Sequence, residues 1–402
     1  MTTSKVNVLI CGGGNAAHVA TGLAASRESL RTSVLTLYSD EAECWANSLK
    51  TNDFTTLIFN PDGSKTAIKS KPELVTKEPA DCVPTADIII FTMPAFAHET
   101  YLTSIEPYIK ENTTIVGLPG QPGFEFQCFY ILKSKAKQCT VMSFETLPWA
   151  CRISEFGKSV DLLGIKQTLS ASFLKQQSRP NYNPLEILQT IMGEKPVLRL
   201  ADNYLELSLF FAMVHPALMY GKWKDWDGEP VQEKPLFYQG VDDVQVRYVD
   251  GISSEMVQTA RTIMAKRPHV DLSGCIHIFD WFKKYYSHTI ADNSSLLSCM
   301  RSNSAYDGLT HPMKVVEGGR FVPDFHYRYL CEDIPFGLAV TKGLAEIAGY
   351  DTPITDEVML WCQEKIGKEY LVGHQLQGKD LADTRAPQRF GFHTLDDLEA
   401  LM

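Results

Sequence analysis

The sequence predicts an α/β protein in which an N-terminal doubly wound sheet is followed by a mainly α-helical domain. Two observations carry this prediction. Through the first half of the chain, short runs rich in β-branched residues alternate with helix-length segments. In the second half, the apolar segments are too long for strands and are separated by Gly or Pro. We therefore expect the sheet domain over residues 1–200 and the helical domain over residues 201–402.

The expected strands of the first half are continuous apolar runs, which is typical of parallel strands covered on both faces. Helices of ordinary length fit between them, as in Ala16–Ser26 and Phe96–Ile109. This alternation of strand and helix favours a parallel, doubly wound sheet. The expected strands are Val6–Cys11, Ser33–Tyr38, Ala86–Thr92, Thr114–Leu118 and Thr140–Phe144.

The second half contains helix-length apolar segments throughout. Within the first of them, Pro216 removes a backbone donor, and we expect the helix to kink or break there. The expected helices lie within Asp202–Gly221, Ser254–Lys266, Ile276–Tyr286, Phe336–Ala348 and Glu357–Leu371.

Composition excludes several classes of protein. The 402 residues include 44% hydrophobic and 21% charged side chains, which is ordinary globular usage. The net charge is −10 and no run of Lys or Arg occurs, so we expect no nucleic-acid partner. No apolar stretch is long enough for a signal peptide or a membrane span. The ten cysteines are scattered without a CxxC pair, so we expect reduced thiols, no metal site and a cytoplasmic location.

A glycine-rich turn joins the first expected strand to the first expected helix. Its residues fit the pattern G-x-G-x-x-A of the Rossmann-like dinucleotide-binding turn. In that turn, glycines allow the backbone to approach a pyrophosphate, which then lies at the helix N-terminus. The alternative is a turn that needs glycine only for packing. The predicted cofactor-binding residues of the turn are Gly12, Gly13, Gly14, Asn15, Ala16 and Ala17.

The residue that binds the adenosine ribose is expected at the end of the second strand, at Tyr38, Ser39 or Asp40. Asp40 would accept hydrogen bonds from a 2′-hydroxyl and repel a 2′-phosphate. No Arg or Lys lies between Tyr38 and Asn47, so we predict NAD(H) over NADP(H). The alternative is that Asp40 caps the helix that follows, and the two roles can coexist.

The loop after the third strand is expected to line the same crevice, because ligands of open α/β sheets bind at the carboxyl ends of the strands. Pro94 and Phe96 are predicted to pack on the nicotinamide side. We interpret His98 as an exposed helix residue.

Candidate chemical groups in the second half are a histidine and a cluster that contains an arginine and two acids. His215 lies within an apolar segment, where a polar ring needs a partner or a role. Arg328 could bind a substrate carboxylate, and Glu332 or Asp333 could orient His215. The alternatives are a core histidine with satisfied hydrogen bonds, and acids that only favour the N-terminus of the next helix.

Several longer motifs show that the chain resembles the opine dehydrogenases of marine invertebrates, which include octopine, tauropine, alanopine and strombine dehydrogenases. The resemblance spans nearly the whole chain. It rests on ICGGGNAAH, MPAFAHE, GLPGQPGFEFQ, MSFETLPWACRI, VHPALMYG, LFYQG, RYLCEDIPFG and EKIGKEYL.

The resemblance implies an NADH-binding Rossmann domain followed by an α-helical opine dehydrogenase domain. It implies that pyruvate, an amino acid such as arginine, alanine, glycine or taurine, and NADH give an opine, NAD⁺ and water, which regenerates NAD⁺ in anaerobic glycolysis. The catalytic pair carries over onto His215 and Asp333, and the arginine that holds the keto-acid carboxylate onto Arg328. The amino-acid pocket carries over onto Glu145 and Thr146. We expect a monomer.

Two other functions fit part of these observations. One is another two-domain NAD-dependent dehydrogenase, of the 2-keto acid, ketopantoate or glycerol-3-phosphate type, although no lysine stands in a motif comparable to theirs. The other is a non-catalytic NAD(H) sensor, which the set of His215, Arg328 and Asp333 argues against.

Overall fold

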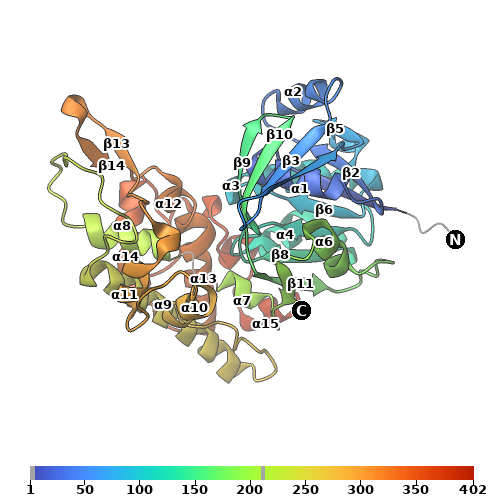
Figure 1. Cartoon of the computed structure of the whole chain (residues 1–402). Coiled ribbons are helices and arrows are strands. Elements are labelled where there is room, and N and C mark those ends of the chain that lie inside the picture. Colours follow the sequence, from blue (N-terminus) through green and yellow to red (C-terminus); the bar gives the residue numbers. More distant parts are fainter. Residues whose placement is uncertain (1–4, 210–212) are drawn as a thin grey trace. The chain divides into compact units, whose positions relative to one another are not determined.

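A computed structural model of the chain describes residues 5–209 and 213–402. The chain forms two compact units, which are drawn in Figure 1. The first unit extends to Leu207 and includes Ala400–Met402, and the second is Ser208–Glu399. The division follows Leu207 rather than residue 200 because the segment after the last strand stays with the first unit. There the Ala201 N–H donates to the Ala171 carbonyl at 2.7 Å, and the buried Tyr204 ring packs edge-on against Phe126.

The first unit is built on an eight-stranded sheet of order β12-β11-β8-β7-β6-β1-β2-β5. The strands from β5 to β8 in that order are parallel, and β11 is antiparallel to β8. The strand order changes direction between β1 and β6, where Rossmann-type sheets bind their ligands. The strands are β1 Val6–Cys11, β2 Leu30–Leu35, β5 Leu74–Thr76, β6 Ile88–Phe91, β7 Thr114–Gly117, β8 Thr140–Phe144, β11 Thr168–Lys175 and β12 Val197–Leu200.

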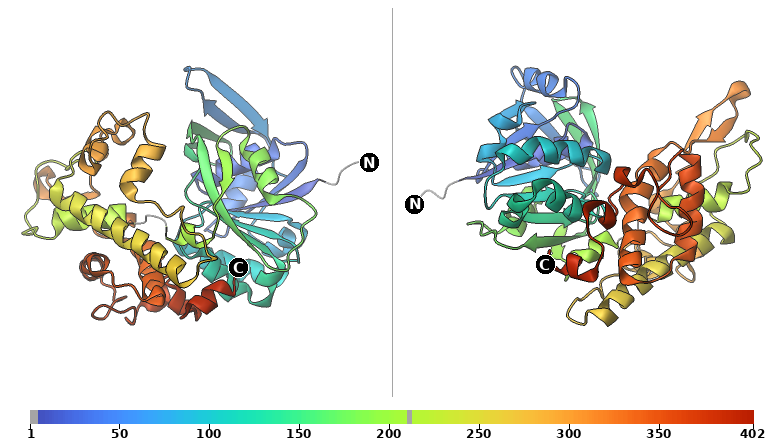
Figure 2. Two further views of the ribbon diagram at one scale, coloured as in Figure 1. Left: turned by 90° about the horizontal axis from the view of Figure 1, so that it is seen from below. Right: turned by 180° about the vertical axis from the view of Figure 1, so that it is seen from behind.

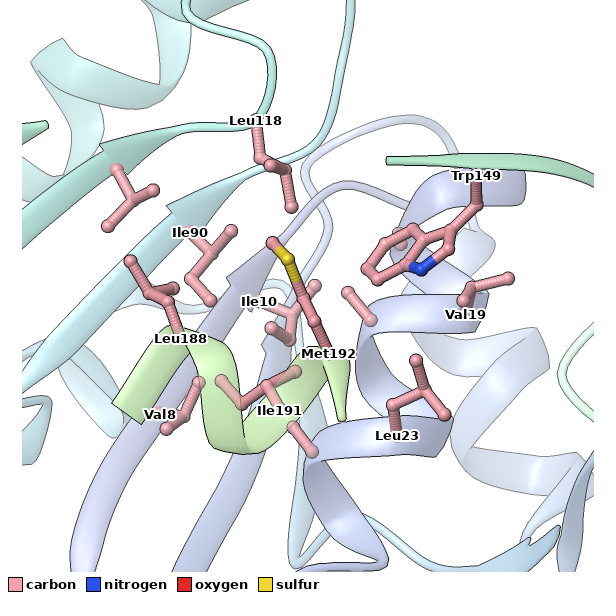
Figure 3. Close-up of a cluster of buried hydrophobic side chains, with 14 of the residues drawn as sticks. Val8, Ile10, Val19, Leu23, Ile90, Leu118, Trp149, Leu188, Ile191 and Met192 are labelled. Carbon is pink, nitrogen blue, oxygen red and sulfur yellow. The ribbon is translucent and has the colours of Figure 1, made fainter. Parts of the chain in front are cut away.

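Helices cover both faces of this sheet, because successive residues of its central strands point to opposite sides. One face packs on α1 and α6, and the other on α3 and α4. Figure 3 shows the first of these cores, in which side chains of β1 and β6 face Val19 and Leu23 of α1 and Leu188, Ile191 and Met192 of α6. The helices of this unit are α1 Asn15–Ala25, α2 Glu41–Ser48, α3 Ala95–Ile105, α4 Phe124–Leu132, α5 Ser134–Gln138 and α6 Pro184–Met192, and α7 Leu205–Ser208 ends one residue beyond its boundary.

A second sheet, of order β4-β3-β10-β9, packs against α1. This sheet was not predicted from the sequence. Its strands come from two distant parts of the chain, and β4 has the mixed pattern KTAIKS and is largely exposed. The strands are β3 Phe54–Phe59, β4 Lys65–Ser70, β9 Trp149–Glu155 and β10 Ser159–Ile165.

The second unit is mainly helical, so the predicted fold class is confirmed for both units. Its longest helix, α9, is the long yellow helix of Figure 2 and packs on α8, α13 and α14. The only strands among its described residues form the hairpin β13 Met313–Val315 and β14 Phe321–Pro323. The helices are α8 Val214–Trp223, α9 Asp243–Lys266, α10 Ile278–Tyr285, α11 Leu296–Ser302, α12 Arg328–Cys331, α13 Ala339–Ala348, α14 Pro353–Lys365 and α15 Leu395–Glu399.

Several predicted bounds differ from the structure. The segment Asp202–Gly221 is not one helix, because α7 ends at Ser208 and α8 begins at Val214; residues 210–212 of the prediction lie outside the described residues. The predicted kink or break at Pro216 is wrong, because α8 runs through this residue from Val214 to Trp223. Pro216 stands in the first turn of α8, where its missing N–H would have no helical partner. A π-helical turn, Ile334–Leu338, precedes α13 where one helix was expected.

Short 3-10 turns complete the described structure. They are Pro79–Asp81, Val83–Thr85, Glu106–Tyr108, Ser304–Tyr306, Glu317–Gly319, Leu381–Asp383 and Pro387–Phe390. No helix of the described residues has the length and apolar character needed to cross a bilayer.

Candidate active site

The glycine turn lies between β1 and α1, at the carboxyl end of the central strand. Gly12 has φ +117°, a conformation that L side chains rarely adopt. Gly14 is the N-cap of α1, no side chain caps this helix, and nothing lies within 4 Å of a Cβ built on Gly14. Backbone N–H groups at the start of α1 are therefore open to a ligand, which fits a pyrophosphate at a helix N-terminus.

A carboxylate that the sequence analysis missed lies beside this turn. A Cβ built on Gly13 would stand 1.9 Å from Oε2 of Glu41, the first residue of α2. The same oxygen accepts a hydrogen bond of 2.6 Å from the Thr36 hydroxyl, directly after β2. Gly13 is thus required for the close approach of the acid, and the acid is held at the end of β2.

Asp40 is exposed and does not cap α2 through its side chain. A hydrogen bond from its own backbone N–H lowers the pKa of the Asp40 carboxyl. The Lys77 ammonium donates to the Ser39 carbonyl at 2.7 Å. Sequence inspection found no basic residue near Asp40 along the chain, but folding brings Lys77 to this loop.

The other predicted cofactor-binding residues differ in exposure. Asn15 accepts a hydrogen bond of 2.8 Å from the Ile153 N–H and so links α1 to β9, while Ala16 and Ala17 are buried. Pro94 is exposed at the N-cap of α3, and the Phe96 ring is 67% exposed.

The interpretation of His98 as an exposed residue is wrong. His98 is buried, with Nε2 3.0 Å from the Met93 carbonyl and its ring edge-on to Phe91 and Phe124. The reason is that α3 packs this side against the sheet.

Glu145 and Thr146 directly follow β8, at the carboxyl end of that parallel strand. Glu145 Oε1 accepts a hydrogen bond of 3.0 Å from the Ser170 N–H, and the Glu145 N–H donates to the Ser170 carbonyl at 3.1 Å. The Thr146 hydroxyl is contacted by the Lys166 ammonium, from the link between β10 and β11. Both predicted substrate residues are half-buried, and Lys166 adds a cation that sequence reasoning missed.

His215 and Asp333 are separated by 118 positions in the sequence and meet in the second unit. His215 Nδ1 lies 2.6 Å from Asp333 Oδ2, and Nε2 lies 2.8 Å from the Tyr238 hydroxyl. Because a carboxylate can only accept, Nδ1 carries the proton, and the neutral ring then accepts from Tyr238 through Nε2. The pair has the geometry in which an acid fixes the tautomer of a catalytic imidazole.

Aromatic rings hold this histidine in place. The His215 ring stacks on Tyr329 at 3.9 Å between centroids with an interplanar angle of 7°, and Tyr238 stacks on Tyr306 at 4.0 Å. Burial raises the pKa of the Tyr238 hydroxyl well above its usual value, so it remains a donor at neutral pH. The His215 side chain keeps 29% of its surface exposed and can be reached from solvent.

Arg328 is the first residue of α12, which packs against α8. Its guanidinium lies 3.2 Å from Glu332 Oε2, and its side chain is 61% exposed, while that of Glu332 is only 6% exposed. The two acids of this cluster therefore have different partners: Glu332 pairs with Arg328 and Asp333 with His215. An exposed guanidinium can receive an anion in addition to this partner.

Sequence reasoning identified the histidine, arginine and acids but missed Tyr238, Tyr329, Glu41 and Lys166. Tyr238 and Tyr329 both lie in quoted motifs, LFYQG and RYLCEDIPFG, which is the one signal that pointed to them. Across the described ranges, no group of three His, Cys, Asp or Glu side chains could hold a metal ion.

Comparison with known proteins identifies the family. Residues 200–366 match the family model described as NAD/NADP octopine/nopaline dehydrogenase, alpha-helical domain. The chain is 56% identical over 404 residues to an opine dehydrogenase of Haliotis discus hannai, with 100% of each covered. It is 47% identical to a tauropine dehydrogenase of Arabella iricolor, covering 98% of this chain and 100% of that protein.

Solved structures agree with these relatives. An octopine dehydrogenase with NADH and L-arginine matches with a TM-score of 0.95 and 48% identity, covering 98% of each chain. An octopine dehydrogenase with NADH and pyruvate matches with a TM-score of 0.93 and 47% identity, at the same coverage. The fold, the full-length relatives and the family model agree with the resemblance that the motifs indicated: this chain belongs to the opine dehydrogenase family.

Proposed function

We propose that this protein is an NADH-dependent opine dehydrogenase that joins pyruvate to an amino acid by reductive condensation. The observation that carries the proposal is the hydrogen-bonded pair of His215 and Asp333, at 2.6 Å, in a member of this family. Relatives named opine dehydrogenase and tauropine dehydrogenase match over 100% and 98% of the chain. The proposed reaction regenerates NAD⁺, as expected of an enzyme of anaerobic glycolysis.

The first unit is suited to the cofactor. The uncapped N-terminus of α1 and the open space at Gly14 fit a pyrophosphate, and Glu41 beside Gly13 fits a ribose hydroxyl. A carboxylate there would repel a 2′-phosphate, which supports NAD(H) over NADP(H), and Asp40 remains a predicted second acid. Bound NADH supplies the hydride that reduces the carbon–nitrogen double bond.

The second unit is suited to proton transfer and to the keto acid. His215 removes a proton from the substrate ammonium so that its nitrogen can attack the ketone, and it returns a proton as water leaves. Asp333 fixes the tautomer and stabilises the protonated ring. The exposed Arg328 guanidinium binds the pyruvate carboxylate and positions its carbonyl carbon for reduction.

Glu145 and Thr146 are proposed to bind the amine substrate. The backbone and carboxylate of Glu145 are both tied to Ser170, so the acid is fixed before a ligand arrives. Its position at the end of β8 is on the carboxyl edge of the sheet, where the glycine turn also lies. A monomer in the cytoplasm remains the expected state of the protein.

The proposed function is tested by NADH oxidation at 340 nm with pyruvate and a panel of arginine, alanine, glycine and taurine. We expect oxidation to require both pyruvate and at least one of these amines. Oxidation with pyruvate alone, or with dihydroxyacetone phosphate, would instead assign a hydroxy-acid or glycerol-phosphate type of dehydrogenase. NADH binding without turnover on any combination would support a sensor.

A further inference from the structure

A lysine from a distant strand connection reaches the segment that is proposed to bind the amine. Lys166 belongs to the link between β10 and β11, and its N–H donates to the Pro148 carbonyl at 3.1 Å. Its ammonium contacts the Thr146 hydroxyl. Both contacts hold Lys166 over the residues that follow β8.

This lysine shares its surroundings with a fixed carboxylate. Glu145 is adjacent to Thr146, and its position is set by the two hydrogen bonds to Ser170. Partial burial lowers the pKa of Lys166, and the negative charge of Glu145 opposes that shift. Lys166 is nevertheless exposed, so a ligand can reach its ammonium group.

The arrangement matches the charges of a free amino acid. A carboxylate suits the substrate ammonium, and a partly desolvated ammonium forms a strong charge-assisted hydrogen bond with a carboxylate or sulfonate. The Thr146 hydroxyl, which accepts from the Lys166 ammonium, is a further hydrogen-bonding group beside this cation. A simple amine, which lacks the acidic group, would leave Lys166 without a ligand.

We infer that the Lys166 ammonium binds the acidic group of the amine substrate while Glu145 binds its ammonium, so that this site selects zwitterions. The inference rests on the proposed function, because it assigns a ligand to the amine site of that reaction. It makes Lys166 a residue that determines specificity and has no part in proton or hydride transfer.

The test compares amino acids with analogues that lack the acidic group, in Lys166→Met and Lys166→Arg. The pairs are L-alanine with ethylamine and L-arginine with agmatine. For the amino acids, we expect Lys166→Met to raise the amine KM by about 10- to 100-fold, the value of one charge-assisted hydrogen bond. The KM values for pyruvate, NADH and the analogues should stay unchanged, and Lys166→Arg should retain most of the affinity.

Lys158→Met is the matched control, because Lys158 lies in the β9–β10 turn and pairs with Glu155 there. It should leave every KM unchanged. An equal rise of KM for the amino acid and its analogue, or no rise for either, would overturn the inference. Should Lys166→Met fold poorly, Lys166→Gln replaces it, with NADH affinity as the check of folding.

Failure of the proposed function is distinguished by binding. If the unmodified protein does not oxidise NADH, calorimetric titration of the NADH-loaded protein with L-alanine and ethylamine still measures the same selectivity. The inference is supported, even without turnover, if L-alanine binds the unmodified protein and does not bind Lys166→Met. Equal binding to both forms of the protein contradicts it.

Discussion

His215 has a hydrogen-bond partner on each ring nitrogen in the structure. Asp333 lies 2.6 Å from Nδ1 and accepts its proton, and the Tyr238 hydroxyl, 2.8 Å from Nε2, donates to the neutral ring. When Nε2 gains a proton, the same hydroxyl can rotate and accept from it, so the ring can change its charge without losing either partner. This geometry suits a group that takes up a proton and returns it within one catalytic cycle.

Removal of this imidazole gives the first prediction. We expect His215→Ala to lower turnover by roughly 10²- to 10⁴-fold, because a positioned acid–base group contributes about that much. The measurement is kcat for NADH oxidation at saturating pyruvate and amine, with NADH affinity as the control, since the cofactor residues lie in the other unit. Near-normal kcat in a folded variant would exclude His215 from the mechanism.

At this scale, the sequence predicted residues better than it predicted contacts. His215, Arg328 and Asp333 were found from their types and their motifs. The contact of Tyr238 with His215 depends on where α8 and the loop before α9 meet, which no local pattern records. The contact of Lys77 with Ser39 could not be predicted from the sequence either, because the two residues are 38 positions apart in the chain.

Helix α9 packs against α8, the helix that contains His215. Gln245 near its N-terminus donates to the Leu218 carbonyl of α8 at 3.1 Å. A Cβ built on Gly221 of α8 would lie 2.7 Å from the Gln245 Cα, so only glycine allows the two helices to approach this closely. The start of α9 is fixed by a capping box, in which the Asp242 carboxylate accepts from the Gln245 N–H at 2.9 Å.

Loss of this cap should destabilise the second unit. We expect Asp242→Ala to lower the free energy of unfolding by about 1 kcal/mol, the usual cost of a lost N-cap. The neighbouring exposed Asp243 does not provide the cap, so Asp243→Ala should change stability by less than about 0.5 kcal/mol. Urea unfolding followed by circular dichroism measures both, and equal effects of the two variants would exclude the capping role.

The elements that the sequence predicted well are those with an unbroken apolar pattern. Buried runs such as Ile88–Phe91 and Thr114–Gly117 can only be central strands of a covered sheet. The second sheet was missed because the exposed side chains of Lys65–Ser70 alternate weakly. This strand pairs with Phe54–Phe59, which in turn pairs with the distant Ser159–Ile165. Short helices such as α7 lack the periodicity that sequence patterns need.

Each unit of the whole molecule contains a buried neutral histidine. His18 stacks on Trp45 and accepts from the Gly157 N–H at 3.0 Å, and burial lowers its pKa to about 4. His311 accepts from the Trp223 indole at 3.1 Å, and burial lowers its pKa to about 3. Both rings are buried, and burial disfavours their protonated, charged form.

Because of these two histidines, we expect the folded protein to lose stability as the pH falls. Above pH 6.5 they are neutral in both the folded and the unfolded chain, so their contribution to stability is fully present. Below pH 6.5 the two histidines become protonated in the unfolded chain but stay neutral in the folded protein. The free energy of unfolding therefore falls by up to about 1.4 kcal/mol per pH unit for each ring. Protonation of the folded rings, near pH 4 and pH 3, limits this loss.

The measurement is urea unfolding between pH 7 and pH 4.5, for the unmodified protein and for His311→Phe. The variant should be less stable at pH 7, since Trp223 loses its acceptor, but its stability should depend less steeply on pH. The exposed His393 provides the control, and His393→Gln should keep the original slope. An unchanged slope in His311→Phe would contradict the account of its protonation.

The product of the proposed reaction distinguishes reductive condensation from simple reduction of the keto acid. The most direct measurement is mass spectrometry of the product formed from pyruvate, the active amine and NADH deuterated at C4 of the nicotinamide. We predict a secondary amine in which one deuterium sits on the pyruvate-derived carbon that is bonded to nitrogen. Deuterated lactate with the amine recovered unchanged would contradict the account.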